Sequence, residues 1–250
     1  MALQEEFESQ GNFLFKYRGY LPILILLPGI YVFMQMEANS DLSHDVKDMY
    51  RLICLLVGLF GILIRAYTVG HTPKNTSGRN TSEGQIADEL NTTGIYSAVR
   101  HPLYVGNFFM WLGITMLTQN LWFCVAFIFM YWVYYERIMF SEEQFLRRKF
   151  GEPYLNWAAK TPAFMPSLKS WLSPKYPFSI KKVLRNEKAG ILYLFLLFFA
   201  FDCLSGYVLH GEWELNQNLW FWMFVGSCVY YIIVKLLAMT TNFFEEEGRV

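Results

Sequence analysis

The sequence has few charged residues and no cysteine motif. Asp, Glu, Lys and Arg make up 17% of the 250 residues, against 54% hydrophobic residues, which is not the balance of a soluble domain. Lys and Arg total 21, as do Asp and Glu, so no net charge attracts nucleic acid. The four cysteines stand singly in apolar stretches, which indicates neither a zinc pair nor a disulfide framework. We therefore predict that most of the chain lies in a membrane.

The sequence also lacks the phosphate-binding motifs of soluble enzymes. It has no GxGxxG fingerprint after a strand and no P-loop, so neither Rossmann-type dinucleotide binding nor NTP hydrolysis is supported. His44, His71 and His210 are isolated from one another, and none of them indicates a metal site. We interpret all three as structural or solvated residues.

Six apolar windows approach the roughly 20 residues that a helix needs to cross a bilayer. They cover residues 20–36, 52–69, 103–117, 121–136, 190–209 and 219–239. Only Thr118, Gln119 and Asn120 separate the third window from the fourth, which predicts a tight antiparallel hairpin. The first window follows an acidic stretch and no small-residue cleavage site follows it, so we expect it to remain in the mature protein. The predicted fold is an all-α, polytopic membrane bundle of about six helices.

Lys and Arg gather in the segments on one side of the predicted spans. These residues are Lys16, Arg18, Lys74, Arg79, Arg100, Lys169, Lys175, Lys181, Lys182, Arg185 and Lys188. The opposite segments hold Lys47 alone among several acidic residues. Since positive residues favour the cytoplasmic side, both termini and the segments 70–102 and 137–189 are predicted to be cytoplasmic. The membrane would be the inner membrane of a bacterium or the endoplasmic reticulum of a eukaryote.

Arg100, His101 and Pro102 stand at the start of the third window. Proline suits the first turn of a helix, so Arg100 and His101 are expected just before a helix N-terminus. Free backbone N–H groups at such an end attract a carboxylate or a phosphate. The alternative is that Arg100 reaches to lipid headgroups and His101 caps the helix.

The helix of the fourth window is predicted to continue past residue 136 with several acidic residues. Glu143 has Arg147 four residues further on, which favours a structural ion pair. Glu142 has only apolar neighbours at helical spacing, so we expect it to meet a cationic ligand or a loop residue at a functional site. Glu136 could pair with Arg65 of another span.

Together, the segment around Arg100, His101 and Pro102 and the acidic segment around Glu142 resemble the isoprenylcysteine carboxyl methyltransferases and the related membrane phospholipid methyltransferases. The resembling positions are Gly94-Ile95-Tyr96, Arg100 to Gly106, Glu142-Glu143, Leu146, Phe150-Gly151, Tyr154 and Pro166. The string covers roughly residues 85–167. The resemblance implies that S-adenosylmethionine binds at the cytoplasmic end of the hairpin, without a Rossmann domain. It also implies a lipophilic methyl acceptor, a lipid or a lipidated cysteine, that enters from the bilayer.

The resemblance assigns roles to individual residues. The implied cofactor-binding residues are Leu90, Asn91, Tyr96, Arg100, His101, Pro102, Leu103, Tyr104 and Glu142. An arginine that orients an anionic acceptor is also implied, and Arg137 is the candidate. Arg137 stands five residues before Glu142, whereas in the family, as aligned, the arginine stands four residues before the glutamate. The extra residue turns Arg137 off that helix face.

We predict three segments: residues 1–70 with two helices, the methyltransferase core 71–168, and residues 169–250 with a basic stretch and two further helices. The last segment could roof the lipid entrance, form a dimer or act as an unrelated anchor, and its lysines favour anionic lipid headgroups. The expected reaction is methyl transfer from S-adenosylmethionine to an oxygen of a carboxylate or phosphate, on a lipid or a prenylcysteine.

Two alternatives differ in class. A nicotinamide-dependent membrane reductase on a similar helical core would need more phosphate-binding cations than Lys74 and Arg79 provide. A transporter or a non-enzymatic scaffold is the second alternative. Transporters favour ionisable residues near the bilayer midplane, whereas the unpaired charges of this chain are expected near one face.

Overall fold

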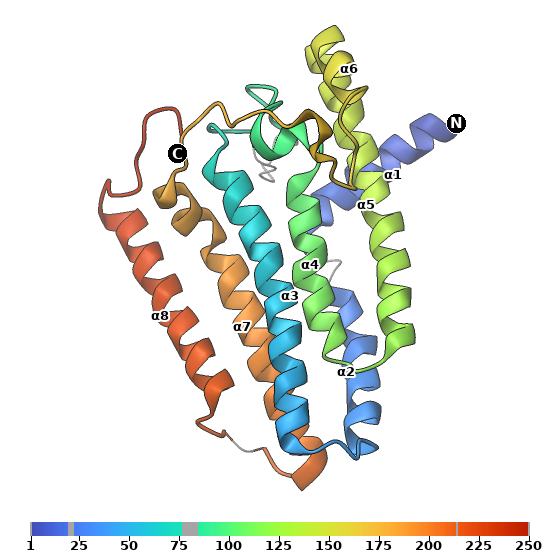
Figure 1. Ribbon diagram of the computed structural model, residues 1–250, viewed down its shortest axis with the longest axis vertical. Helices are drawn as coiled ribbons and strands as arrows, with labels where there is room; N and C mark the ends of the chain where they lie inside the picture. The colour runs from blue at the N-terminus through green and yellow to red at the C-terminus, as the bar shows by residue number, and fades with distance from the viewer. Residues whose placement is uncertain (1, 20–22, 77–84, 214, 250) are drawn as a thin grey trace.

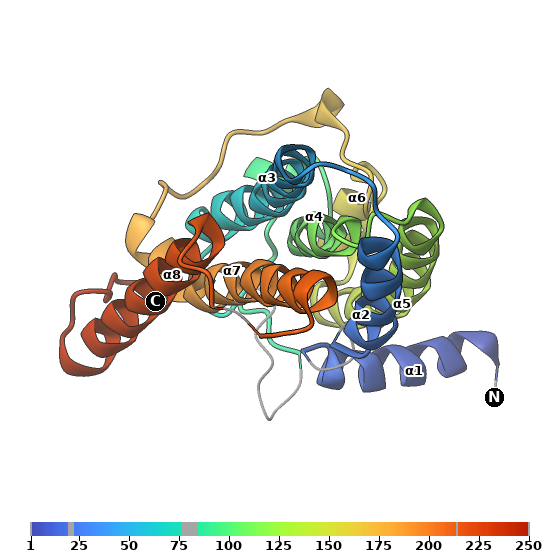
Figure 2. The ribbon, with the colours of Figure 1, turned by 90° about the horizontal axis from the view of Figure 1, so that it is seen from below.

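The structure is a computed structural model that describes residues 2–19, 23–76, 85–213 and 215–249. Within these ranges the chain forms eight α-helices and two short 3-10 turns, and no strand. The long helices stand side by side as a bundle, and α1 (Leu3–Tyr17) crosses one side of it next to α5 (Leu121–Phe150) (Figure 1, Figure 2). The prediction of an all-α bundle is confirmed. Tyr20 and Arg79, which entered the sequence argument, lie outside the described residues.

Each of the six predicted windows coincides with a helix. The helices are α2 (Ile23–Ala38), α3 (His44–Gly70), α4 (Pro102–Met116), α5, α7 (Ile180–His210) and α8 (Leu219–Thr240). By length and composition α3, α5, α7 and α8 are able to cross a membrane. The other two are shorter, with 16 residues in α2 and 15 in α4.

Several helices extend beyond the apolar windows. Helix α7 begins at Ile180 rather than at residue 190, because the side chain of Ser179 accepts a hydrogen bond from the backbone N–H of Lys182 and caps the helix. The basic residues that follow are good helix formers. Helices α1 and α6 (Glu152–Ala158) were not predicted, since neither has a long apolar run.

The tight hairpin between α4 and α5 is present as predicted. Gln119 adopts a positive φ of 54° in the turn. The side chain of Asn120 then accepts a hydrogen bond from the backbone N–H of Phe123 at 2.9 Å and caps α5. Helix α5 continues to Phe150, well past the apolar window. This extension brings its acidic residues to the end of the bundle where the long loops lie.

Helices α3 and α4 approach each other closely through glycines. A Cβ atom on Gly61 would lie 2.4 Å from the carbonyl oxygen of Gly106, and one on Gly113 would lie 2.5 Å from the carbonyl oxygen of Cys54. Small residues at such contacts are typical of helix packing in membranes, where close van der Waals contact replaces the hydrophobic effect. The α3–α4 pair is therefore the tightly packed centre of the bundle.

We expect Gly113→Ala to lower the free energy of unfolding by about 1–2 kcal/mol, because the added methyl group forces two backbones apart. Gly226→Ala in α8 is the matched control, since a Cβ atom there meets nothing within 4 Å. It should be neutral or slightly stabilising. Unfolding in detergent with increasing denaturant measures both variants. Equal effects of the two substitutions would contradict the close approach of α3 and α4.

The two C-terminal helices are joined to the rest of the bundle by packing and by buried charge. Helix α7 packs against α3, and α8 packs against α7 on the outside (Figure 1). A cluster of Glu37, Lys47, Arg51, Asp202 and Ser205, here called the Glu37 cluster, links α2, α3 and α7. The carboxylate of Glu37 is fully buried and lies 3.0 Å from the Lys47 ammonium.

Candidate functional site

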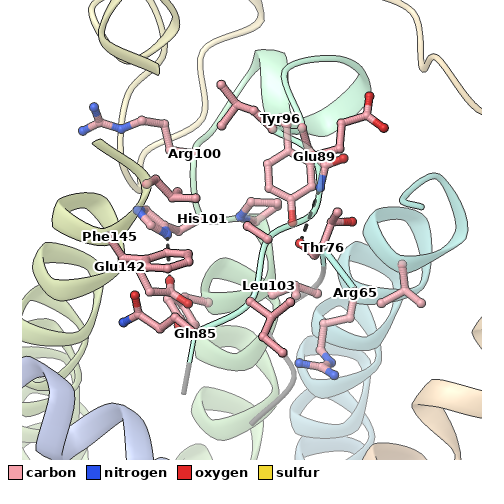
Figure 3. Close-up of a pocket in the computed structure, with 18 of the residues that line it drawn as sticks. Arg65, Thr76, Gln85, Glu89, Tyr96, Arg100, His101, Leu103, Glu142 and Phe145 are labelled. Carbon is pink, nitrogen blue, oxygen red and sulfur yellow. Dashed lines mark hydrogen bonds and ion pairs between the residues drawn. The ribbon is translucent and has the colours of Figure 1, made fainter. Parts of the chain in front are cut away.

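A cavity of about 500 Å³ opens where the loop before α4, the outer part of α5 and the start of α7 meet (Figure 3). The nine residues expected to hold the cofactor all line it. They are Leu90, Asn91, Tyr96, Arg100, His101, Pro102, Leu103, Tyr104 and Glu142. Glu142 stands 38 to 52 positions after the other eight residues in the sequence, and the hairpin of α4 and α5 brings them together.

His101 joins two carboxylates at the N-terminus of α4. Its Nε2 atom lies 3.0 Å from a carboxylate oxygen of Glu143, and its Nδ1 atom lies 3.4 Å from one of Glu142. The guanidinium of Arg100 lies 3.2 Å from the same Glu143 oxygen. Burial by itself would lower the pKa of His101, but hydrogen bonds and charge attraction from the two carboxylates outweigh it and raise the pKa.

These contacts decide two of the sequence predictions. The expected Glu143–Arg147 pair is wrong, because Glu143 pairs with Arg100 and His101 of the loop before α4. An exposed pair on one helix is worth only about 0.3–0.5 kcal/mol, which a partly buried carboxylate with two cationic partners readily exceeds. Glu142 has a loop residue, His101, as its partner, as predicted.

The loop that carries Arg100 and His101 is held by the segment after α6. The backbone N–H of Arg100 donates to the carbonyl of Pro162 at 2.9 Å, and that of His101 donates to the carbonyl of Ala163 at 3.2 Å. The indole N–H of Trp157 donates to the carbonyl of Tyr96. These bonds hold the backbone of the loop, and so position Arg100 and His101 without a ligand.

The opposite wall of the mouth is the segment around Glu89, Leu90 and Asn91. Glu89 forms an ion pair with Lys175 and accepts a hydrogen bond from the Tyr176 hydroxyl at 2.7 Å. The hydrogen bond from Lys175, followed by that from Tyr176, lowers the pKa of Glu89. Because Lys175 belongs to the segment before α7, that segment also positions the loop that carries Leu90 and Asn91.

The chain matches known membrane methyltransferases over its middle part. A family described as phospholipid methyltransferase matches residues 51–153. The protein-S-isoprenylcysteine O-methyltransferase of Schizosaccharomyces pombe is 40% identical over 128 residues, which are 51% of this chain and 54% of that protein. The corresponding protein of Xenopus laevis is 31% identical over 138 residues, 54% of this chain and 48% of that protein.

A third relative has a different name. The nickel-cobalt-cadmium resistance protein NccN of Alcaligenes xylosoxydans xylosoxydans is 35% identical over 112 residues, 44% of this chain and 52% of that protein. The resemblance to the membrane methyltransferases is confirmed. The chain spans about half the length of the curated relatives it matches, and no solved structure matches it. The match together with the apolar helices makes this a membrane protein with a methyltransferase-like core at residues 51–153.

Arg137 is not among the residues that line the cavity of the methyltransferase-like core. Its guanidinium lies 3.5 Å from the ring centre of Phe7 in α1 and hydrogen-bonds to Glu136 at 3.0 Å. Five residues at 100° each turn Arg137 roughly 140° away from Glu142, so the two side chains leave α5 on different faces. The suggested pair of Glu136 with Arg65 is wrong, because each side chain bonds to another residue.

Several cavity residues were not identified as site residues from the sequence. They include Arg18, Arg65, Asn107, Arg185, Asn186, Glu187 and Lys188. Arg65 could have been identified from the sequence, because an ionisable residue inside an apolar span is a functional candidate by default. Glu187 could not, since it stands within a basic stretch that is typical of a membrane-surface segment. The start of α7 therefore adds a wall that lies outside the matched residues 51–153.

Proposed function

We propose that the protein is a membrane methyltransferase that transfers a methyl group from S-adenosylmethionine to an oxygen of a lipophilic acceptor. The observation that supports this most is the convergence of the nine cofactor candidates on one cavity within and beside the matched core. We further propose that these nine residues bind the cofactor, and that the acceptor is a prenylcysteine carboxylate, as the names of the relatives suggest, or a lipid carboxylate or phosphate.

The donor set of the cavity fits S-adenosylmethionine. The volume of about 500 Å³ is that of a small-molecule site. Glu142 and Glu143 offer carboxylates to the positive sulfonium and ammonium groups of the cofactor. Arg100 and the N-terminus of α4 offer N–H donors to its carboxylate. When bound, the cofactor supplies an electrophilic methyl group on a sulfonium.

The residues of this chain then need only bind and align the reactants. Methyl transfer is a displacement at carbon, so most of the catalysis comes from alignment in a site that excludes water. An acceptor that is already an anion needs neither a protein nucleophile nor a general base. Leu103 and Tyr104, in the first turn of α4, line the cavity, and we propose that an acceptor from the bilayer enters beside them. The cavity mouth would face the cytoplasm, of either a bacterial inner membrane or the endoplasmic reticulum.

Titration calorimetry of the detergent-purified protein with S-adenosylmethionine tests the proposal. We expect saturable binding by the wild type and at least a tenfold higher Kd for Glu142→Gln and for Arg100→Ala, because each loses a charged contact. Glu136→Gln is the matched control on the same helix, since Glu136 is outside the cavity, and it should bind like the wild type.

NADPH is titrated beside S-adenosylmethionine, because one observation favours the reductase. Arg185 and Lys188 line the cavity, and phosphate-binding cations are what a nicotinamide reductase would require. Binding of NADPH by folded protein that does not bind S-adenosylmethionine would overturn the methyltransferase and support the reductase. Failure to bind either molecule would favour the non-enzymatic scaffold.

A further inference from the structure

Arg65 lies on the side of the cavity opposite to Glu142. It projects from α3, whereas Glu142 projects from α5, and Figure 3 shows the cavity between them. The guanidinium donates a hydrogen bond from Nη1 to the side-chain oxygen of Asn107 at 2.6 Å. Asn107 is the sixth residue of α4, whereas His101 caps the helix, so Arg65 lies further along α4 than His101 and closer to the middle of the bundle.

Glu187 of α7 holds this guanidinium in a fixed plane. Its two carboxylate oxygens accept hydrogen bonds from Nε and Nη2 of Arg65 at 2.8 and 2.9 Å. The side chain of Glu187 is 1% exposed, whereas that of Arg65 is 22% exposed. Contacts among the described residues use three of the five N–H donors of Arg65. One donor on Nη1 and one on Nη2 remain for a ligand.

We propose that Arg65, oriented by Glu187 and Asn107, binds the carboxylate of the methyl acceptor. This inference rests on the proposed function and gives Arg65 the task that the sequence suggested for Arg137. Arg65 suits it because it lines the cavity and presents N–H groups from a rigid fork, the geometry that recognises carboxylates. Glu187 is a positioning residue, and it comes from the helix that lies outside the matched core.

The Arg65–Glu187 pair suits the charge changes of this reaction. A carboxylate oxygen forms the new O–C bond, the S–C bond breaks with its electron pair going to sulfur, and the acceptor becomes a neutral ester. No proton is transferred. A strong uncompensated cation would bind the anionic ground state more tightly than the transition state, in which that charge is fading, and would slow the reaction. Because Glu187 offsets the charge of Arg65, the pair orients the acceptor by hydrogen bonds while leaving its oxygen nucleophilic.

Direct binding of two matched probes tests the recognition of the carboxylate. N-acetyl-S-farnesylcysteine and its C-terminal amide share one lipid tail and differ in head-group charge. They are titrated into the detergent-purified full chain in the presence of S-adenosylhomocysteine. We expect the wild type to prefer the acid about tenfold, and Arg65→Lys to reduce the preference to about twofold, because a lysine lacks the fork. Equal preferences in wild type and Arg65→Lys would overturn the proposal.

Arg51→Lys is the matched control. Arg51 is also on α3 and also pairs with a carboxylate of α7, Asp202 at 2.9 Å, but it lies roughly 20 Å further along the helix at 1.5 Å per residue. If the acid preference depended only on an ion pair that joins α3 to α7, Arg51→Lys would lose the preference as well. We expect it to keep the preference of the wild type.

Steady-state kinetics then separate orientation from charge. We expect Glu187→Gln to lower the KM for the acid and to lower kcat about tenfold, because the uncompensated guanidinium holds the anion too tightly. If the role of Glu187 were purely structural, Glu187→Gln would not lower the KM together with kcat, and that result would contradict its assignment as a positioning residue.

A loss of S-adenosylmethionine affinity in Arg65→Lys would show that Arg65 holds the cofactor instead. The acid preference is measured by binding, so it tests Arg65 even if the wild type transfers no methyl group.

Discussion

His101→Leu should lower the free energy of unfolding at pH 6 by about 2–3 kcal/mol, which is the range for losing a hydrogen-bonded charged partner. The imidazolium of His101 is 6% exposed and is the group that two carboxylates share. Glu143 keeps Arg100 in the variant, whereas Glu142 loses its cation. The two acidic side chains would then repel each other at the mouth of the cavity.

This deficit should depend on pH in a defined direction. The pKa of His101 is raised in the folded protein by Glu142 and Glu143, against the effect of burial. A raised folded pKa means that the stabilisation is complete below the ordinary value near 6.5 and is lost as the pH rises through the folded value. Wild type and His101→Leu should therefore differ most at pH 6 and least near pH 9.

Thermal unfolding in detergent between pH 5.5 and 9 measures this difference. His71→Leu controls for the loss of an imidazole ring, since the Nδ1 atom of His71 contacts the carbonyl of Tyr176 rather than an acidic side chain. A gap between wild type and His101→Leu that stays constant over the whole range would show that packing, and not the charge of His101, explains the loss.

The hydrophobic pattern predicted the helices, and the motif predicted the composition of one wall of the cavity. Apolar runs alone identified α2, α3, α4, α5, α7 and α8, because the thickness of the bilayer requires long apolar helices whatever their exact residues. The three polar residues 118–120 predicted the hairpin, and the hairpin in turn places Arg100 and His101 opposite Glu142. The grouping of residues that depends on local spacing was thus predictable from the sequence.

Features that depend on contacts between distant segments were not readable. Helix α1 has a mixed composition, and its Gly11 and Phe15 are buried by packing, Gly11 against the backbone of α5 at Arg137. The predicted partner of Glu143 was wrong because Arg147, the nearest cation on the same helix, competes with Arg100 and His101 of a distant loop, which no spacing rule describes. The role of Glu187 could not be predicted from the sequence, because it depends on the packing of α7 against α3, which places Glu187 next to Arg65.

The largest loss of stability is expected from Lys47→Met in the Glu37 cluster. Glu37 is fully buried, and its carboxylate accepts hydrogen bonds from Lys47 at 3.0 Å and from the Ser205 hydroxyl at 2.6 Å. Arg51 is 3.9 Å away but is already bonded to Asp202. Removing one partner of a buried ion pair leaves an uncompensated charge, which costs about 3–5 kcal/mol.

The double variant Glu37→Gln/Lys47→Met separates charge from packing in this cluster. An amide in place of Glu37 can still bond to Ser205 and carries no charge, so we expect the double variant to recover most of the lost stability in denaturant unfolding. Lys235→Met, at an exposed lysine of α8, should change little. If the double variant remains as unstable as Lys47→Met, the packing of the lysine chain, and not its charge, joins α2 to α3. If it recovers, the uncompensated charge of Glu37, and not lost packing, accounts for the instability of Lys47→Met.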